Sequence, residues 1–244
     1  MLAQLSDLHL RPGDPGSVVK VQRAVSAVAA METPPDAVLV SGDVADVPEP
    51  EVYARARELL EAAGLPLLVI PGNHDDRDLL VAAFGPLPAA ATAGELRVVT
   101  ADTSRPGRAD GRLEEADLEQ LDAELARDTH TPTVLAMHHP PVLTGLRALD
   151  AIGLPAGDRA ALHRLLDRHP QVHTVACGHV HRTMTTALGR AAVLICPGVS
   201  SQLRLDLRPA DDLPIELADE PSGIALHVLV DGGVRSHVVT LPDV

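Results

Sequence analysis

Apolar runs of strand length alternate with amphipathic segments along the first 70 residues. Residues 2–6, 37–41 and 65–70 form the runs, and between the first two lie valines at helical period, Val18, Val21, Val25 and Val28. A second helical pattern follows residue 48 and ends at Gly64, a residue type that favours a helix C-cap. Strands that are buried on both faces are continuously apolar, so this β-α-β-α-β order predicts a parallel sheet.

The middle of the chain continues this alternation, and the last quarter changes it. We expect strands and helices in turn at residues 95–101, 113–127, 131–137, 157–168 and 172–177. Four strand-like segments with short turns follow, at residues 182–188, 191–196, 223–230 and 233–241. Asp231-Gly232-Gly233 predicts a hairpin, and the Pro- and Asp-rich residues 208–222 predict a long loop. The sequence therefore predicts one domain over residues 1–244, which includes the strand-rich tail from about 182 to 244.

Five polar clusters each follow directly on a predicted buried strand. They are Asp7-x-His9, Gly42-Asp43-x-x-Asp46, Gly72-Asn73-His74-Asp75, His138-His139 and Gly178-His179-x-His181. In open α/β sheets ligands bind outside the carboxyl ends of the strands, so we expect these distant segments to meet at one place. An extended backbone sends residues two apart to the same side, which would let each x-separated pair bind one site.

The side chains in these clusters are those of a metal site without thiolates. Imidazoles, carboxylates and an amide suit borderline ions such as Mn, Fe, Co or Zn. Seven side chains exceed the three or four protein ligands of one catalytic zinc, and two ions that share Asp43 would use them all. The seven predicted ligands are Asp7, His9, Asp43, Asn73, His138, His179 and His181. His139 is left open, either as a residue behind the ligands or as one that faces substrate.

A pair of metal ions about 3.5–4 Å apart is a recurring arrangement for displacement at phosphorus. His74 adjoins the predicted ligand Asn73, so it is placed to stabilise developing charge or to protonate the leaving oxygen. The sequence thus predicts one catalytic group beside the ions, His74.

In this order, from residue 7 to residue 181, the five clusters resemble the signature of calcineurin-like metallophosphoesterases. Within that superfamily they most resemble the bacterial class III cyclic-nucleotide phosphodiesterases and their glycerophosphodiesterase relatives. The resemblance implies an α/β protein with a four-layer α/β/β/α sandwich of two mixed sheets. It implies a first ion on Asp7, His9, Asp43 and His181 and a second on Asp43, Asn73, His138 and His179. It also implies two catalytic residues, His74, which faces the substrate, and Asp46, which orients His74. The resemblance further implies that the loop 102–113 lies near the active site.

The resemblance makes a metal-dependent phosphoric ester hydrolase the leading hypothesis. We expect it to hydrolyse a small phosphodiester, 3′,5′-cyclic AMP to 5′-AMP, by in-line attack of a hydroxide that bridges two divalent or trivalent ions. A glycerophosphodiesterase, or a phosphomonoesterase and phosphodiesterase of broad specificity, is the alternative within the same chemistry. A protein phosphatase fits less well, because that branch would have other residues at Val47, Pro48 and Asp75. A non-catalytic scaffold ranks last, since it would be expected to have lost ligands that this chain retains.

Composition and charge set expectations about binding partners and cellular location. The net charge is −14 and no basic stripe is visible, so no nucleic acid polymer is expected as a partner. The N-terminus lacks a secretory pattern, no apolar run is long enough to span a bilayer, and two cysteines make no disulfide framework, so we expect a cytoplasmic protein without a membrane partner. With one Tyr, one Phe and no Trp, base stacking has few candidates. A homodimer is left open.

Overall fold

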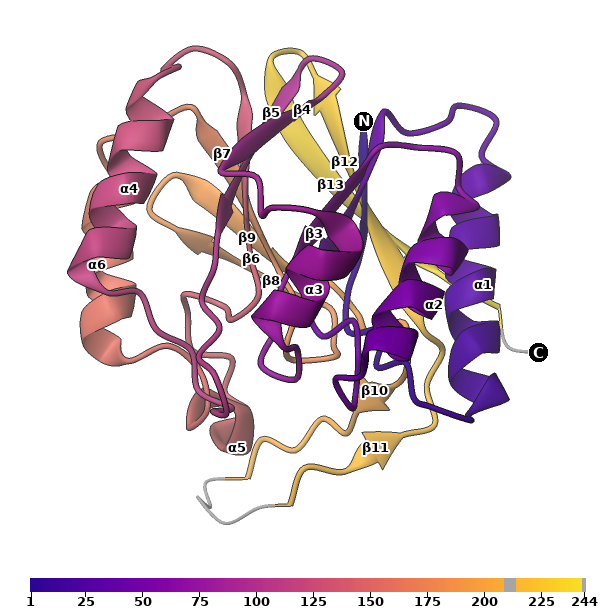
Figure 1. Ribbon diagram of the computed structural model, residues 1–244. Helices are drawn as coiled ribbons and strands as arrows, with labels where there is room; N and C mark the ends of the chain where they lie inside the picture. Colours follow the sequence, from indigo (N-terminus) through magenta and orange to yellow (C-terminus); the bar gives the residue numbers. More distant parts are fainter. Residues whose placement is uncertain (209–213, 243–244) are drawn as a thin grey trace.

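The computed structural model describes residues 1–208 and 214–242. Two mixed sheets face each other and helices cover both outer faces, which confirms the four-layer sandwich (Figure 1). The first sheet has the order β13-β12-β1-β2-β3, with bounds Gly233–Thr240, Gly223–Val230, Leu2–Leu5, Ala37–Ser41 and Leu67–Ile70. The second has the order β4-β5-β6-β7-β9-β8, with bounds Ala90–Ala93, Leu96–Ala101, Thr133–Met137, Val172–Cys177, Ala191–Ile195 and Met184–Leu188.

The parallel strands of each sheet are neighbours of one another. β1, β2 and β3 are mutually parallel, as are β5, β6, β7 and β9, whereas β4, β8, β12 and β13 run antiparallel to their neighbours. The strand-rich tail is divided between the sheets, and the predicted hairpin at Asp231 joins β12 to β13. All the parallel carboxyl ends therefore point to one edge of the sandwich.

Three apolar layers explain why the strands read as continuous apolar runs. Helices α1 (Pro15–Ala29), α2 (Pro50–Glu61) and α3 (Arg77–Phe84) pack on the first sheet, and α4 (Glu115–Ala126) and α6 (Ala156–Leu166) pack on the second. Between the sheets lies a thin third layer that includes Leu39, Ile70, Val98, Ala136 and Ala176. Each central strand thus buries both of its faces, and this burial is the main favourable term in the fold.

Several short elements were not predicted. Helix α3 has eight residues and buries only Leu80 fully, so its apolar spacing is a weak signal. The strand β4 and the one-turn helix α5 (Arg147–Asp150) were also missed. Residues 208–222 are not wholly a loop, because β11 (Leu217–Ala218) pairs with β10 (Gln202–Leu203); residues 209–213 of that stretch lie outside the described part. In the described ranges, no helix has the length and apolar character needed to cross a bilayer.

One buried histidine lies between the two sheets, away from the polar clusters. His227 of β12 is fully buried, donates from Nε2 to Gln4 Oε1 at 2.9 Å and accepts at Nδ1 from Ser236 Oγ at 2.8 Å. Gln4 in turn donates to Ser41 Oγ at 2.8 Å and to the Cys177 carbonyl at 3.0 Å. Burial lowers the pKa of His227 to about 4, so its imidazole is neutral in the folded protein at neutral pH.

This histidine predicts a loss of stability in mild acid. Its pKa in the folded state lies below the value of about 6.5 in the unfolded chain, so its contribution is present above pH 6.5 and is lost as pH falls towards 4. Between pH 6.5 and 5 we expect a loss of roughly 2 kcal/mol in unfolding free energy. Urea titrations of His227→Gln should show the loss between pH 6.5 and 5 reduced by this amount, while His237→Gln, which changes an exposed histidine on β13, should leave the loss unchanged. An unchanged loss in His227→Gln would contradict the assignment.

Candidate metal centre

The five polar clusters do meet at one edge of the sandwich. β1 and β2 bring Asp7, His9 and Asp43, β3 brings Asn73, and β6 and β7 of the facing sheet bring His138, His179 and His181. The site therefore lies across the gap between the two sheets, with each side chain in the loop directly after its strand. All seven predicted ligands are brought together here.

Asp7, His9, Asp43 and His181 form the first group, whose potential ligand atoms all lie within 4.8 Å of one another. His9 Nε2 lies 3.0 Å from His181 Nε2 and 3.4 Å from Asp43 Oδ2, and His181 Nε2 lies 3.4 Å from Asp7 Oδ1. Two imidazole nitrogens and two carboxylate oxygens thus face a common point.

The second group shares Asp43 with the first. Asn73 Oδ1 lies 3.1 Å from His138 Nε2 and 2.9 Å from His179 Nδ1. Asp43 Oδ2 lies 3.5 Å from His138 Nε2, almost the same distance as to His9 in the first group. One carboxylate oxygen therefore faces both groups, which is the geometry expected of a ligand that bridges two ions.

Hydrogen bonds behind the histidines aim their free nitrogens at the centre. Nδ1 of His138, His181 and His9 lies 2.8 Å from the Ser41 carbonyl, 3.1 Å from the Ser201 carbonyl and 3.0 Å from Asp46 Oδ1, respectively. Each oxygen accepts the Nδ1 proton, so in the neutral ring that binds a metal ion the lone pair is at Nε2. Metal-binding histidines in proteins are held in this way by an acceptor on the other ring nitrogen.

The backbone at the centre is held in an uncommon conformation. Among the described ranges six non-glycine residues have positive φ, and five of them belong to this site: Asp7, His9, Asp43, His179 and His181, at 54°, 43°, 52°, 71° and 49°. Such residues cost on the order of 1 kcal/mol or more each and cluster at functional sites. The expectation of extended backbone in the two x-separated pairs was therefore wrong. Asp7 and His9 share one group, whereas His179 and His181 belong to different groups.

Asp75, for which the sequence motif predicted no structural role, fixes two of these loops to each other. Its carboxylate accepts from the backbone amides of Val44 at 3.1 Å, Ala45 at 3.0 Å and Gly72 at 2.9 Å, and from the hydroxyl of Tyr53 at 3.1 Å. The loop after β2 carries Asp43 and the loop after β3 carries Asn73. Asp75 therefore sets the distance between residues of the two ligand groups.

Gly72 shows how closely these loops approach. A Cβ atom at Gly72 would lie 2.1 Å from Asp43 Oδ1 and 2.4 Å from the Asp43 backbone nitrogen. Any larger residue would push the Asp43 carboxylate out of the position where it faces both groups. The glycine of the Gly72-Asn73-His74 motif is thus required by space.

Asp46 has a different principal partner from the one implied by the resemblance. Its Oδ1 lies 3.0 Å from His9 Nδ1 but 3.8 Å from His74 Nδ1, and its Oδ2 accepts from Arg11 Nε at 2.9 Å. The hydrogen bond from His9 lowers the pKa of Asp46 to about 2. The imidazole of His74 is 42% exposed in the cleft, and its Nδ1 lies 3.4 Å from the Asp46 backbone carbonyl. Asp46 therefore orients His9 through its carboxylate and His74 mainly through its carbonyl.

Both ring nitrogens of His139 already have protein partners. Nδ1 lies 2.8 Å from Thr103 Oγ1, Nε2 lies 3.1 Å from the Ala109 carbonyl, and the ring packs 4.5 Å from that of His179. Burial, with the neighbouring His138, lowers the pKa of His139 to about 3, so the ring is neutral. His139 thus fastens the loop 102–113 against the site rather than facing substrate.

Electrostatics and unpaired atoms both favour cations at the centre. Burial opposes protonation of His138, yet the Asp43 carboxylate raises its pKa to about 9. Burial also opposes protonation of His9, but the hydrogen bond to Asp46 and the charges of Asp43 and Asp7 raise its pKa. Within the described residues, the buried atoms Asp7 Oδ2 and His179 Nε2 have no hydrogen-bond partner. Two Nε2 lone pairs 3.0 Å apart, at His9 and His181, also require a cation or a proton between them, so these residues fit a pair of metal ions.

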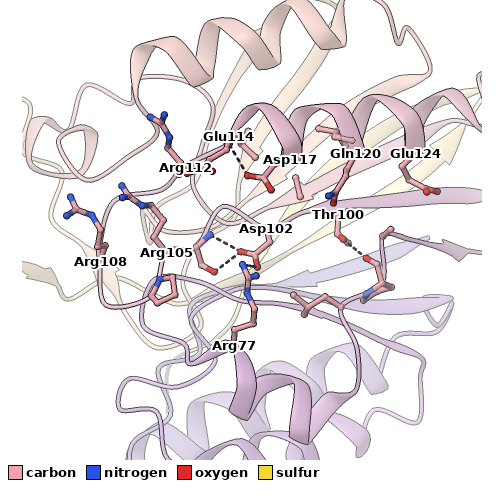
Figure 2. A pocket seen from close by; sticks show the side chains of 18 residues that line it. Arg77, Thr100, Asp102, Arg105, Arg108, Arg112, Glu114, Asp117, Gln120 and Glu124 are labelled. Carbon is pink, nitrogen blue, oxygen red and sulfur yellow. Dashed lines mark hydrogen bonds and ion pairs between the residues drawn. The ribbon is translucent and has the colours of Figure 1, made fainter.

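A cleft of about 440 Å³ opens from these groups and is lined by His9, Asp43, Asn73, His74, His179 and His181. A larger hollow of about 560 Å³ lies beside α4 and the loop 102–113 (Figure 2). None of the predicted site residues lines that hollow, and its arginines face carboxylates, for example Arg77 with Asp102. The chemistry is therefore assigned to the smaller cleft.

Comparison with known proteins agrees with this geometry. Residues 1–183 match the model of the family described as calcineurin-like phosphoesterase. A probable cyclic nucleotide phosphodiesterase from Synechococcus sp. is 35% identical over 234 residues, which cover 91% of this chain and 88% of that protein. A probable glycerophosphodiester phosphodiesterase from Arcobacter nitrofigilis is 31% identical over 253 residues, 97% of this chain and 92% of that protein.

A solved dimetal phosphatase from Danio rerio shares the fold. Its TM-score is 0.67 at 16% identity, over 99% of this chain and 98% of that one. At this identity the likeness shows the fold alone, but the family model spans the segment that carries all five polar clusters. The chain therefore belongs to the calcineurin-like phosphoesterase family.

Proposed function

We propose that this protein is a binuclear-metal phosphodiesterase that hydrolyses small phosphodiesters, with 3′,5′-cyclic AMP converted to 5′-AMP as the leading substrate. The observation that carries the proposal is Asp43 Oδ2, which faces the His9 group at 3.4 Å and the His138 group at 3.5 Å. Relatives named as phosphodiesterases over nine-tenths of the chain support the reaction class. The glycerophosphodiesterase alternative keeps the same centre, and the relative from Arcobacter nitrofigilis favours it.

The ligand sets follow the two groups. Asp7, His9, Asp43 and His181 would hold one ion, and Asp43, Asn73, His138 and His179 the other. Two such ions supply a nucleophile from water at neutral pH and neutralise charge on the phosphoryl oxygens. The imidazole and carboxylate donors suit Mn, Fe, Zn or Co.

The side chains of the cleft complete the reaction. His74 donates Nδ1–H towards the Asp46 carbonyl, which orients the ring with Nε2 on the other side. In its doubly protonated form the ring also carries a proton on Nε2, which can bond to the phosphoryl group or pass to the leaving oxygen. Arg11 keeps Nε on Asp46 and lines the cleft, where its positive charge attracts a phosphodiester. A cleft of about 440 Å³ suits a small substrate rather than a polymer. The two free, buried cysteines are consistent with a cytoplasmic location.

Turnover assays on metal-loaded protein test the proposal. We expect hydrolysis of cyclic AMP and of bis(p-nitrophenyl) phosphate, and we expect His74→Ala to lower kcat by about 10²–10⁴-fold because a general acid is lost. Metal analysis should find the same two ions per chain in His74→Ala as in the native protein. Absence of turnover of any phosphodiester would refute the proposal, and a normal kcat in His74→Ala would refute the role of that imidazole.

A further inference from the structure

The cleft at the metal centre has an aliphatic wall in addition to its polar residues. Five aliphatic side chains line it: Leu149 of α5, Ile152 just after it, Leu203 of β10, and Ile215 and Leu217 of the β11 segment. α5, β10 and β11 all lie together at the lower end of the molecule in Figure 1, beyond the carboxyl ends of the central strands. The wall and the metal ligands therefore border one cavity.

Part of this wall is anchored and part is free to gain contacts. Leu149 and Leu203 are buried in the core of the second sheet, and Ile152 packs against the same cluster. Ile215 and Leu217 are 52% and 71% exposed, although both line the cavity. When an apolar ligand surface covers exposed aliphatic groups beside a catalytic cleft, their burial contributes favourably to the free energy of binding.

Aliphatic side chains are the apolar contacts that this chain can offer a ligand. Its single tyrosine, Tyr53, is fully buried and bonded to Asp75 and Asp76, and its single phenylalanine, Phe84, packs in the core of the first sheet. Neither lines the cleft. A flat apolar group in the cleft would consequently lie against leucine and isoleucine rather than stack on the ring of a tyrosine or phenylalanine.

Cations complement this wall within the same cavity. Arg11 and Lys20 line the cleft; Arg11 is bound through Nε to Asp46, and Lys20 Nζ donates to the Ser200 carbonyl. A ligand with a phosphate at one end and an apolar face at the other matches this distribution of charge and aliphatic surface. A phosphorylated polyol would match the charges but would place hydroxyl groups against the wall, where they would lose water without gaining partners.

We infer that the wall of Leu149, Ile152, Leu203, Ile215 and Leu217 binds the nucleobase of a nucleoside phosphodiester and selects it over glycerol-based diesters. The inference rests on the proposed function for its substrate class. Ile215 and Leu217 are the specificity residues, because they are the members of the wall with the largest exposed surface to cover. Both side chains act by contact with the organic group of the substrate, and neither takes part in the hydrogen bonds that hold the metal ligands.

Binding of two monophosphates to the metal-loaded protein isolates this contact. Calorimetry should show that 5′-AMP binds more tightly than glycerol 3-phosphate. Leu217→Ser and Ile215→Ser should each lower the affinity for 5′-AMP by about tenfold. The affinity for glycerol 3-phosphate should change by less than twofold in both variants. Leu205→Ser is the matched control, since Leu205 is 56% exposed, lies between β10 and β11, and is outside the cleft lining. It should leave both ligands unaffected.

Turnover gives a second measurement of the same contact. In Leu217→Ser we expect the KM for cyclic AMP to rise about tenfold with kcat within twofold, and the KM for glycerophosphoethanolamine to stay within twofold. Equal losses for both ligands, or no loss in either variant, would overturn the inference. If native protein hydrolyses no phosphodiester but 5′-AMP binding still depends on Leu217, the proposed function fails while the assignment of the wall stands. If the protein hydrolyses both diesters without any dependence on Leu217 or Ile215, the proposed function stands and the assignment of the wall fails.

Discussion

Asp43→Asn is expected to lower kcat/KM for phosphodiesters by about 10³-fold or more and to reduce the bound metal from two ions per chain to one or fewer. The physical reason is that Asp43 Oδ2 faces donors of both groups, at 3.4 and 3.5 Å. An amide of the same shape removes the negative charge from that position, and metal-ion stabilisation of the transition state is worth several kcal/mol.

The substitution is chosen so that the fold survives. Asp43 has a φ of 52°, which asparagine tolerates better than most residues, and an amide oxygen can still accept the hydrogen bond from the His74 amide at 2.9 Å. Metal content by mass spectrometry and initial rates would be measured on the same samples. Asp122→Asn, which alters an ion pair with His169 away from the cleft, should retain both ions and full activity. A variant at Asp43 with two ions and more than a tenth of native activity would contradict the bridging role.

Asp75→Ala should have the largest effect on stability, a loss of about 4 kcal/mol in unfolding free energy. It leaves three backbone amides and the Tyr53 hydroxyl without their acceptor in a buried position, and each unpaired buried group costs about 1–3 kcal/mol, less where water can enter. Because Asp75 joins the loops that carry Asp43 and Asn73, metal affinity should fall as well.

Urea denaturation of the metal-free protein measures the stability effect without the contribution of bound ions. The neighbouring Asp76→Ala is the matched control: it removes only the N-cap of α3, whose side chain accepts from Leu79 N at 3.0 Å, and should cost about 1 kcal/mol. A loss at Asp75 no larger than that at Asp76 would show that the two loops are held by other contacts.

The convergence of the site could be predicted because its cause is topological. Parallel strands deliver their carboxyl ends to one edge, so the placement of Asp7, Asp43, Asn73, His138 and His179 after strands was sufficient to expect one site. The strands themselves were readable because both of their faces are buried, and the four-layer fold followed from the resemblance to the family.

The roles of the supporting residues could not be read in the same way. An aspartate in a turn has the same sequence signal whether it binds a metal, caps a helix or accepts backbone amides, and Asp75 proved to do the last. Asp46 contacts His9 more closely than His74, and the chain after β2 has left-handed backbone at Asp43; no residue pattern indicated either feature. The aliphatic wall was missed since β10, β11 and α5 are too short to show a period.

The central claim is that one carboxylate joins two metal ions at the carboxyl edge of both sheets. The most direct measurement is a crystal structure of the metal-loaded protein with anomalous difference maps recorded on both sides of the metal absorption edge. We predict two anomalous peaks about 3.5–4 Å apart, with Asp43 between them and Asp7 and Asn73 on opposite sides. A single peak, or an Asp43 carboxylate that contacts only one ion, would contradict the account.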